Sequence, residues 1–171
     1  MNNTKLITWD TDISNGVFSV QSSGSRSTYH IARELGKYIR EGDVLCLHGE
    51  LGAGKTVFAK GIADALGVSK AWTQVVSPTF VLVKEYLGRL KMIHIDLYRI
   101  QDPCELPNLG LNEYFYGHDV VLIEWPERCE QLLPDKSIHI YIDFMSLRKR
   151  HIRIKGLLSD RLMSDDRHIR L

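Results

Sequence analysis

The sequence has few cysteines, a nearly balanced charge and no long apolar segment. There are three cysteines, Cys46, Cys104 and Cys129. This number is odd, and their spacing matches neither a zinc site nor a disulfide framework. The formal net charge of +1 provides no overall attraction to nucleic acid or membrane, so a contact with RNA would be local or made through a partner. No apolar run approaches the ~20 residues that span a bilayer, and the first residues lack a signal-peptide pattern. We therefore expect a cytoplasmic protein without membrane contact.

One segment restricts the chemistry of the chain more than any other. Gly49–Thr56 reads Gly-Glu-Leu-Gly-Ala-Gly-Lys-Thr and fits the phosphate-binding pattern G-x-x-x-x-G-K-[ST] at every fixed position. The apolar run 44–47 before it predicts a buried strand, and apolar residues at helical spacing after it predict a helix that ends near Gly67. In these surroundings such a loop turns its backbone N–H groups toward an anion. The alternative is a glycine-rich turn that binds nothing.

Within this loop, Lys55 would reach the outer phosphates of a nucleotide and the Thr56 hydroxyl would bind Mg²⁺. The Asn-Lys-x-Asp element of guanine-specific switches does not occur in the sequence, which favours ATP over GTP. The motif assigns eight positions to nucleotide binding: Gly49, Glu50, Leu51, Gly52, Ala53, Gly54, Lys55 and Thr56.

The rest of the chain predicts alternating strands and helices. Expected strands are 6–9, 17–20, 120–123, 137–143 and 151–154, with a hairpin formed by 80–86 and 91–97. Expected helices start at Ser27 or Thr28, at Pro103, at 111 and at 126. This order predicts an α/β, single-domain, P-loop NTPase-like three-layer fold with a mixed central sheet and helices on both faces.

The ends of the chain are less informative. The serine-rich stretch 22–25 predicts a flexible linker. We divide the chain into an N-terminal extension of unclear role (1–26), a P-loop ATPase domain (27–156) and a C-terminal tail (157–171).

Two carboxylates are candidates to hold Mg²⁺ or to order a water molecule. Asp96 and Glu124 each follow an apolar strand, and strand ends form the ligand crevice of such sheets. Their spacing does not choose between them. We favour Glu124 as the metal ligand because its strand is the more purely apolar, which leaves Asp96 to polarise water or to position the γ-phosphate. The alternative for either is a structural carboxylate that caps a helix or pairs with Arg99.

Three further features have a structural and a functional interpretation. Trp125 follows Glu124 directly and is either a core residue or part of the site. The loop Ser77–Phe80, which includes Thr79, is either a simple turn or a segment that orders around the γ-phosphate. The basic cluster 148–155 is either the solvated face of an edge strand or a contact for RNA.

These motifs occur together in one family, and the chain resembles the TsaE (YjeE) family. The shared residues are Gly49–Thr56, Ser77–Phe80, Asp96–Arg99 and Glu124–Pro126, with matches at 105–106 and 109–111 between the last two. The resemblance covers about residues 27–155. It implies a slow ATPase that binds ATP and Mg²⁺ and acts with TsaB and TsaD in threonylcarbamoyladenosine modification of tRNA, resetting that complex between turnovers.

The resemblance also implies roles for individual residues. Thr56 and Glu124 would contact the metal, Asp96 and Trp125 would be needed for activity, and Thr28 and Arg150 would lie near the nucleotide. Glu50 departs from the family, which more often has Asp there, and residues 1–26 and those after Gly156 have no counterpart.

We therefore predict an ATPase partner of a tRNA-modifying complex, with tRNA contacted only indirectly. Lys55, Asp96, Glu124 and Trp125 are the predicted catalytic residues, and Thr79 shapes the closing side of the site with Trp125. Two alternatives remain: a P-loop small-molecule kinase, for which residues 98–118 are short and poor in arginine, and an assembly module that nucleotide controls without catalysis.

Overall fold

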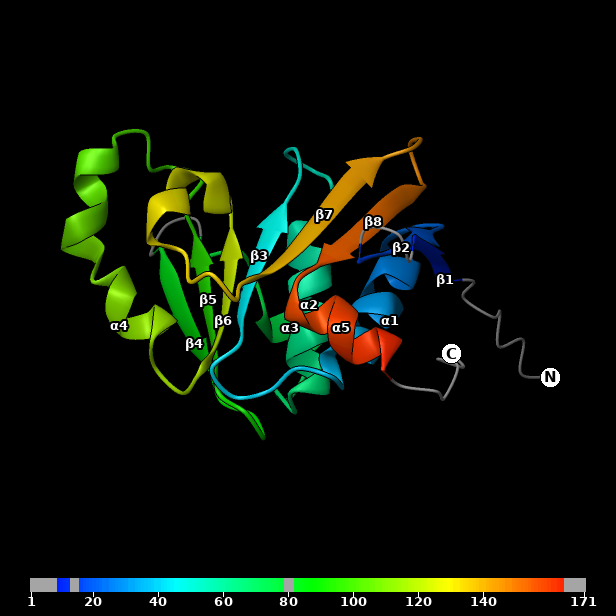
Figure 1. Cartoon of the computed structure of the whole chain (residues 1–171), viewed down its shortest axis with the longest axis horizontal. Helices are drawn as coiled ribbons and strands as arrows, with labels where there is room; N and C mark the ends of the chain where they lie inside the picture. Colours follow the sequence, from blue (N-terminus) through cyan, green and yellow to red (C-terminus); the bar gives the residue numbers. More distant parts are fainter. Residues whose placement is uncertain (1–8, 13–15, 79–81, 165–171) are drawn as a thin grey trace.

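The computed structural model describes residues 9–12, 16–78 and 82–164. Its described strands form one sheet of eight strands in the order β1-β2-β8-β7-β3-β6-β5-β4 (Figure 1). The strands are β1 (Trp9–Asp12), β2 (Val17–Ser22), β3 (Val44–His48), β4 (Val83–Tyr86), β5 (Met92–Asp96), β6 (Val120–Glu124), β7 (Ile138–Phe144) and β8 (Arg150–Lys155). The helices are α1 (Ser25–Gly36), α2 (Lys55–Ala65), α3 (Ala71–Gln74), α4 (Leu111–Phe115) and α5 (Leu157–Met163), with 3₁₀ helices η1 (Pro103–Leu109), η2 (Pro126–Arg128) and η3 (Glu130–Leu132).

The centre of the sheet is parallel and its edges are antiparallel. Strand β3 pairs in parallel with β6 and β7, and β6 pairs in parallel with β5. Strand β4 runs antiparallel to β5, and β8, β2 and β1 continue the other edge as antiparallel neighbours. Every residue of β5 and β6 is buried, as expected for strands covered on both faces. The parallel pairing brings the carboxyl ends of β3, β6 and β5 to one edge.

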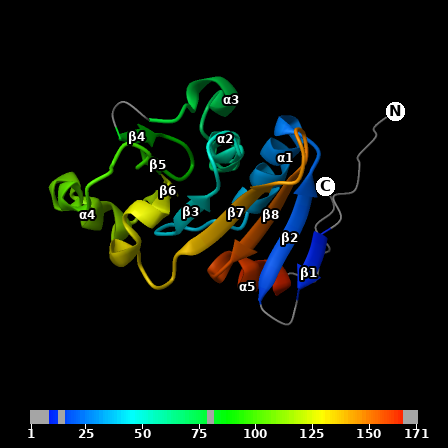
Figure 2. The same ribbon diagram turned by 90° about the horizontal axis from the view of Figure 1, so that it is seen from above.

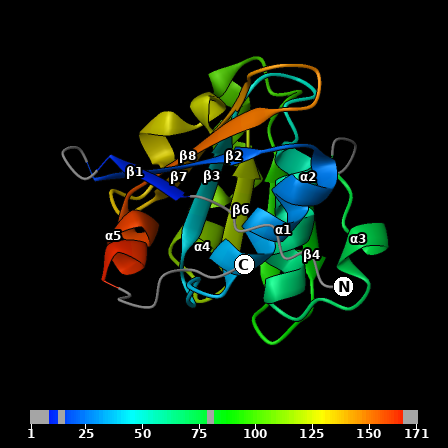
Figure 3. The same ribbon diagram turned by 90° about the vertical axis from the view of Figure 1, so that its right-hand side faces the viewer.

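Two clusters of buried side chains lie on opposite faces of the sheet. The first joins α1, α2 and α5 to residues such as Leu47, Leu122 and Ile140. The second joins η1 and α4 to Cys46, Ile95 and other residues of the opposite face. Figure 2 shows α2 and α4 on the two sides of the central strands, and Figure 3 shows α1 beside α2. The predicted three-layer α/β class with a mixed sheet is therefore confirmed.

Most predicted elements are present. The strand, loop and helix around 44–66 and the hairpin of β4 and β5 are confirmed, as are the strands near 120–123, 137–143 and 151–154. The segment 126–133 forms two short 3₁₀ helices, η2 and η3, rather than one helix. Of the strand expected at 6–9, only Trp9 lies within the described residues.

The serine-rich segment corrects one prediction. Ser22 ends β2 and is buried, while α1 begins at Ser25, before the Ser27 or Thr28 that the sequence favoured. The Ser22 hydroxyl hydrogen-bonds to the Thr28 hydroxyl at 2.8 Å, so the segment is a tight strand-to-helix connection and not a flexible linker.

Described parts of both chain ends take part in this fold. Strands β1 and β2 extend the sheet, and α5 places Leu158 and Leu162 in the first core cluster. Arg161 of α5 donates to Asp43 Oδ1 at 2.9 Å and to the Tyr38 carbonyl at 2.9 Å, which ties α5 to the connection between α1 and β3. Within the described ranges, none of the helices has the length and apolar character needed to cross a membrane.

Candidate nucleotide-binding site

The loop between β3 and α2 has the backbone geometry that a phosphate loop requires. Gly49 leaves β3 with φ 148°, and a Cβ at this position would lie 2.6 Å from the Ile142 carbonyl oxygen. Gly54, with φ 112°, directly precedes the first turn of α2. Both positions are closed to ordinary L-residues, so the glycines of the motif are needed for the loop to reach the helix N-terminus.

Lys55 is the first residue of α2 and its side chain folds back over the loop. Its ammonium donates to the carbonyl oxygens of Gly49 at 2.6 Å and Glu50 at 3.0 Å, and it lies 4.0 Å from the centre of the Trp125 ring. Burial lowers the pKa of Lys55, while Glu124, Glu127 and Asp96 act in the opposite direction. A buried cation surrounded by oxygens and an aromatic face is well placed to exchange these partners for phosphate oxygens.

Thr56 and Glu124 come together across the sheet edge. The Thr56 hydroxyl donates to Glu124 Oε1 at 2.9 Å, and the Glu124 side chain is buried at the end of β6. A hydroxyl and a carboxylate oxygen are hard ligands suited to Mg²⁺, which takes only one or two protein carboxylates beside the phosphates. Among the described residues, no group of three or more His, Cys, Asp or Glu side chains forms a protein-only metal site. The residues present therefore fit a cation carried in with a nucleotide.

Asp96 ends β5 directly opposite Glu124 in the register of the parallel strands. Its Oδ1 accepts the Tyr98 amide hydrogen at 3.0 Å, and its Oδ2 accepts the Ser77 hydroxyl. The bond to Ser77 connects β5 to the loop that the sequence marked as a possible γ-phosphate segment. Thr79 of that loop lies outside the described residues, so its role stays a prediction.

Trp125 has a strained backbone. Its φ of 62° places a bulky residue in the left-handed region, directly after the metal-ligand candidate Glu124. The indole packs against Tyr98, with ring centres 5.2 Å apart, and covers the Lys55 ammonium. Strain of this kind, which costs on the order of 1–3 kcal/mol, is concentrated at functional sites. Trp125 is thus a wall of the site as well as a partly buried residue.

Arg150 and Thr28 are placed differently with respect to the loop. Arg150 Nε donates to the Ala53 carbonyl at 2.9 Å, and its guanidinium lies 4.2 Å from the Phe144 ring centre. Thr28 is buried in α1 against Ser22. Arg150 therefore contacts the phosphate loop, whereas the proximity of Thr28 to a nucleotide remains a prediction.

The basic cluster 148–155 alternates between solvent-exposed charged residues and buried isoleucines. Arg153 makes an exposed ion pair with Asp143, whose Oδ2 lies 2.8 Å from Arg153 Nη2. Its neighbours Ile152 and Ile154 are buried. This alternation agrees with the solvated face of a strand, and contact of the cluster with RNA stays a prediction.

Sequence reasoning missed one buried polar residue of the site. His94 of β5 is fully buried, and its Nε2 lies 3.0 Å from Glu124 Oε1. The signal was present in the sequence, because a histidine two residues before Asp96 on an alternating strand lies on the same face as Asp96.

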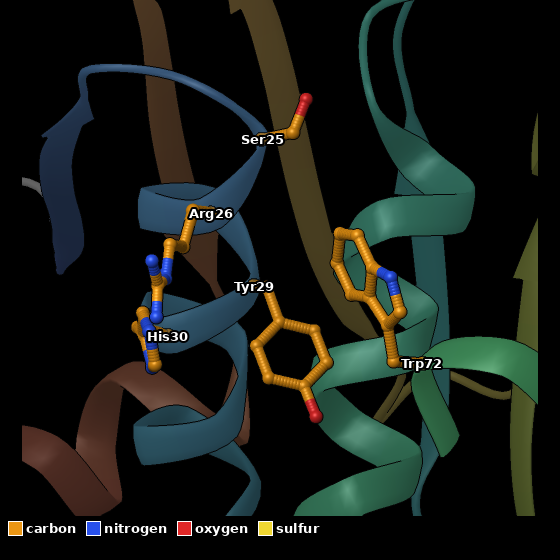
Figure 4. A pocket seen from close by; sticks show the side chains of 5 residues that line it. All are labelled: Ser25, Arg26, Tyr29, His30 and Trp72. Atoms are coloured by element: carbon orange, nitrogen blue, oxygen red, sulfur yellow. The ribbon is translucent and has the colours of Figure 1, made fainter. Parts of the chain in front are cut away.

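A pocket of about 440 Å³ is lined by residues of α1 and α3, none of them from the loop (Figure 4). Tyr29 and Trp72 form an edge-to-face pair with ring centres 5.1 Å apart, and the Lys60 ammonium lies 4.9 Å from the Trp72 ring centre. The lining residues are Ser25, Arg26, Tyr29, His30 and Trp72.

The fold and the loop define the P-loop class of α/β proteins. Within that class, a model of the family described as threonylcarbamoyl adenosine biosynthesis protein TsaE matches residues 22–152. The chain belongs to this TsaE family.

Individual relatives agree with this assignment. The tRNA threonylcarbamoyladenosine biosynthesis protein TsaE of Bacillus subtilis (strain 168) is 46% identical over 116 residues, which are 67% of this chain and 70% of that protein. The protein of the same name from Treponema pallidum (strain Nichols) is 38% identical over 133 residues, 76% of this chain and 96% of that protein. The crystal structure of Bacillus subtilis YdiB matches with a TM-score of 0.72 and 34% identity, covering 86% of this chain and 90% of that one.

Proposed function

We propose that this protein is a Mg²⁺-dependent ATPase that acts in the biosynthesis of threonylcarbamoyladenosine in tRNA. The observation that carries the proposal is the convergence of Lys55, Thr56, Asp96 and Glu124 at one edge of the sheet, around a glycine-rich loop. Membership of the TsaE family supports the place of this site in tRNA modification.

Each residue has a role set by its contacts. The loop amides and Lys55 bind the phosphates, and Thr56 and Glu124 hold the cation, which when bound neutralises charge on the transferring phosphoryl group. Asp96, oriented by Ser77 and the Tyr98 amide, accepts a hydrogen bond from the attacking water. Trp125 holds Lys55 between the loop and its ring and limits the access of water from that side. The rate gain comes from positioning and charge stabilisation.

The sequence identifies no arginine that would stabilise the transition-state charge, and Arg150 donates to the Ala53 carbonyl of the loop itself. We infer slow turnover by the protein alone and faster turnover with TsaB and TsaD. A hydrolysis rate that those two proteins leave unchanged contradicts this part of the proposal.

Hydrolysis without an acceptor is the first test. Incubation of the protein with ATP and Mg²⁺ should release free phosphate, whereas a small-molecule kinase requires its acceptor. Asp96→Ala should abolish phosphate release and leave ATP binding intact, since Asp96 acts on water and not on the nucleotide. If Asp96→Ala still supports tRNA modification, nucleotide controls assembly without catalysis.

The partners are tested separately by capture of TsaB and TsaD on the immobilised protein, with and without ATP. Retention of both proteins that depends on nucleotide supports the proposal. No retention in either condition overturns the partner assignment while leaving the ATPase assignment in place.

A further inference from the structure

His94 is a fully buried histidine in the middle of β5, between two apolar residues of the second core cluster. It is not part of the phosphate loop and does not lie at a strand end. Burying a polar ring without full hydrogen bonding is costly, and an apolar side chain of similar size avoids that cost. A requirement other than packing is therefore needed to explain a histidine at this position.

Among the described residues, the side-chain hydrogen bond of His94 is directed at the site. His94 Nε2 lies 3.0 Å from Glu124 Oε1, the same oxygen that accepts the Thr56 hydroxyl at 2.9 Å. A carboxylate oxygen accepts, so in this contact His94 carries a hydrogen on Nε2 and donates it to Glu124. His94 Nδ1 is buried and has no hydrogen-bond partner among the described residues, so within them the ring is held by hydrogen bonding only through Nε2.

The strand register explains how this contact arises. His94 pairs with Leu122, and Asp96 pairs with Glu124, in the parallel ladder of β5 and β6. Side chains two residues apart on a strand share a face, so His94 reaches Glu124 diagonally on the side where α2 carries Thr56. Glu124 Oε1 is thereby held from two elements, β5 and α2.

We propose that His94 is the positioning residue for Glu124. By donating to Oε1 it fixes the rotamer of this carboxylate and leaves its remaining lone pairs available to the cation bound with the nucleotide. The inference rests on the proposed function, because it concerns the metal ligand of that site. Partners of this kind, which touch the ligand and not the metal, typically change metal affinity by roughly 10- to 100-fold when removed.

Two variants separate positioning from packing. His94→Leu keeps apolar bulk and removes the donor, whereas His94→Gln retains an N–H at the end of a chain long enough to reach the carboxylate. The measurement is calorimetric titration of ADP at a series of Mg²⁺ concentrations, with a parallel series in EDTA. We expect His94→Leu to need roughly 10- to 100-fold more Mg²⁺ for the same ADP affinity, and His94→Gln to recover most of that loss. ADP binding in EDTA should be equal in all three proteins.

A second measurement uses the unmutated protein without nucleotide. ¹⁵N NMR of the histidine ring nitrogens should show a hydrogen on Nε2 of His94. A hydrogen on Nδ1 alone overturns the inference even if His94→Leu does not fold.

The outcomes distinguish the two proposals. An unchanged Mg²⁺ requirement in His94→Leu overturns the positioning role and leaves the ATPase proposal standing. A loss in His94→Leu that His94→Gln does not recover also overturns it, because packing then explains the effect. If the unmutated protein binds ADP without any dependence on Mg²⁺, the proposed function fails, and the inference fails with it.

Discussion

The two halves of the sheet bury polar groups in opposite ways. In the parallel half, β5 and β6 are buried throughout, yet they carry His94, Asp96 and Glu124, each no more than 3% exposed. The antiparallel half begins at β7, which pairs in parallel with β3 on one side and antiparallel with β8 on the other. Here β7 and β8 alternate between outward polar residues and buried isoleucines: Ile138, Ile140, Ile142, Ile152 and Ile154.

The difference shows where stability and function are separated in this protein. A buried polar group is costly unless its hydrogen bonds are made, and in the parallel half they are made largely among the site residues and with Thr56. The isoleucines of the antiparallel half stabilise the fold by burying apolar surface, and they have no side-chain hydrogen bonds to satisfy. We therefore expect substitutions in the antiparallel half to affect mainly stability, and substitutions at the parallel strand ends to affect mainly nucleotide and metal binding.

The largest expected effect is on stability. Ile140→Ala removes a fully buried side chain of β7 and should lower the free energy of unfolding by about 2–5 kcal/mol, measured by urea denaturation. Tyr141→Ala, on the outward face of the same strand, is the matched control and should cost less. If ADP affinity of the folded Ile140→Ala protein falls as much as its stability, the division between the halves does not hold.

The counterpart in the site is Lys55→Ala. It removes a charge-assisted contact to phosphate and should weaken ATP binding by about 1.5–3 kcal/mol, that is roughly 10- to 100-fold, in calorimetry. Lys136→Ala removes the same charge from an exposed turn and should leave the affinity unchanged. Tight ATP binding by Lys55→Ala contradicts the assignment of the loop.

A smaller effect is expected at the junction of the two halves, where His48 stacks on Tyr141 and hydrogen-bonds to His139. Burial, and next the neighbouring His139, lower the pKa of His48 from 6.5 to about 4. The unfolded chain then binds more protons than the folded one between these values, so stability is full above about pH 6.5 and is lost as pH falls toward about 4.

The test is the pH dependence of urea denaturation in His48→Phe, which keeps an aromatic ring and cannot titrate. Its stability should fall less steeply between pH 6.5 and 4 than that of the unmutated protein. Glu127, with Oε2 at 3.8 Å from His48 Nδ1, favours the protonated ring and reduces the difference. Equal slopes in the two proteins exclude His48 as the origin.

The smallest effect belongs to the outward face of the antiparallel half. Asp143→Ala breaks the exposed ion pair with Arg153 and should cost about 0.2–1 kcal/mol, because both partners are well solvated. A double-mutant cycle with Arg153→Ala measures the pair, and the coupling should decrease in high salt. A coupling energy of several kcal/mol means that this face is not the solvated surface inferred from its alternation.

Elements that are determined by a few neighbouring residues were predictable from the sequence. The strand, loop and helix around Gly49–Thr56 follow from a short motif, and the hairpin of β4 and β5 follows from two β-rich runs around Gly88. Helix α5 was not predicted, because its leucines have meaning only when they pack on β8 and Arg161 reaches Asp43. The serine-rich segment was misread for the same reason: its composition suits a linker, but burial of Ser22 and Thr28 closes it into a tight connection.

The site divides in the same manner. Lys55 and Thr56 are adjacent to the loop in the sequence, so the motif identifies them directly. The choice between Asp96 and Glu124 could not be made from spacing, since both end apolar strands. In the structure the Thr56 hydroxyl bonds to Glu124, whereas Ser77 bonds to Asp96, and the roles of the two acids stay predictions.

By itself the sequence determined the phosphate loop, the α/β class and the strand-end acids, because glycine placement and apolar periodicity act over a few residues. Only the tertiary structure decided which acid meets Thr56, that His94 hydrogen-bonds to the same acid, and that Trp125 covers Lys55. These contacts join residues up to 70 positions apart, 55 to 125 at the widest. Strand order and register set such distances, and no local pattern encodes them.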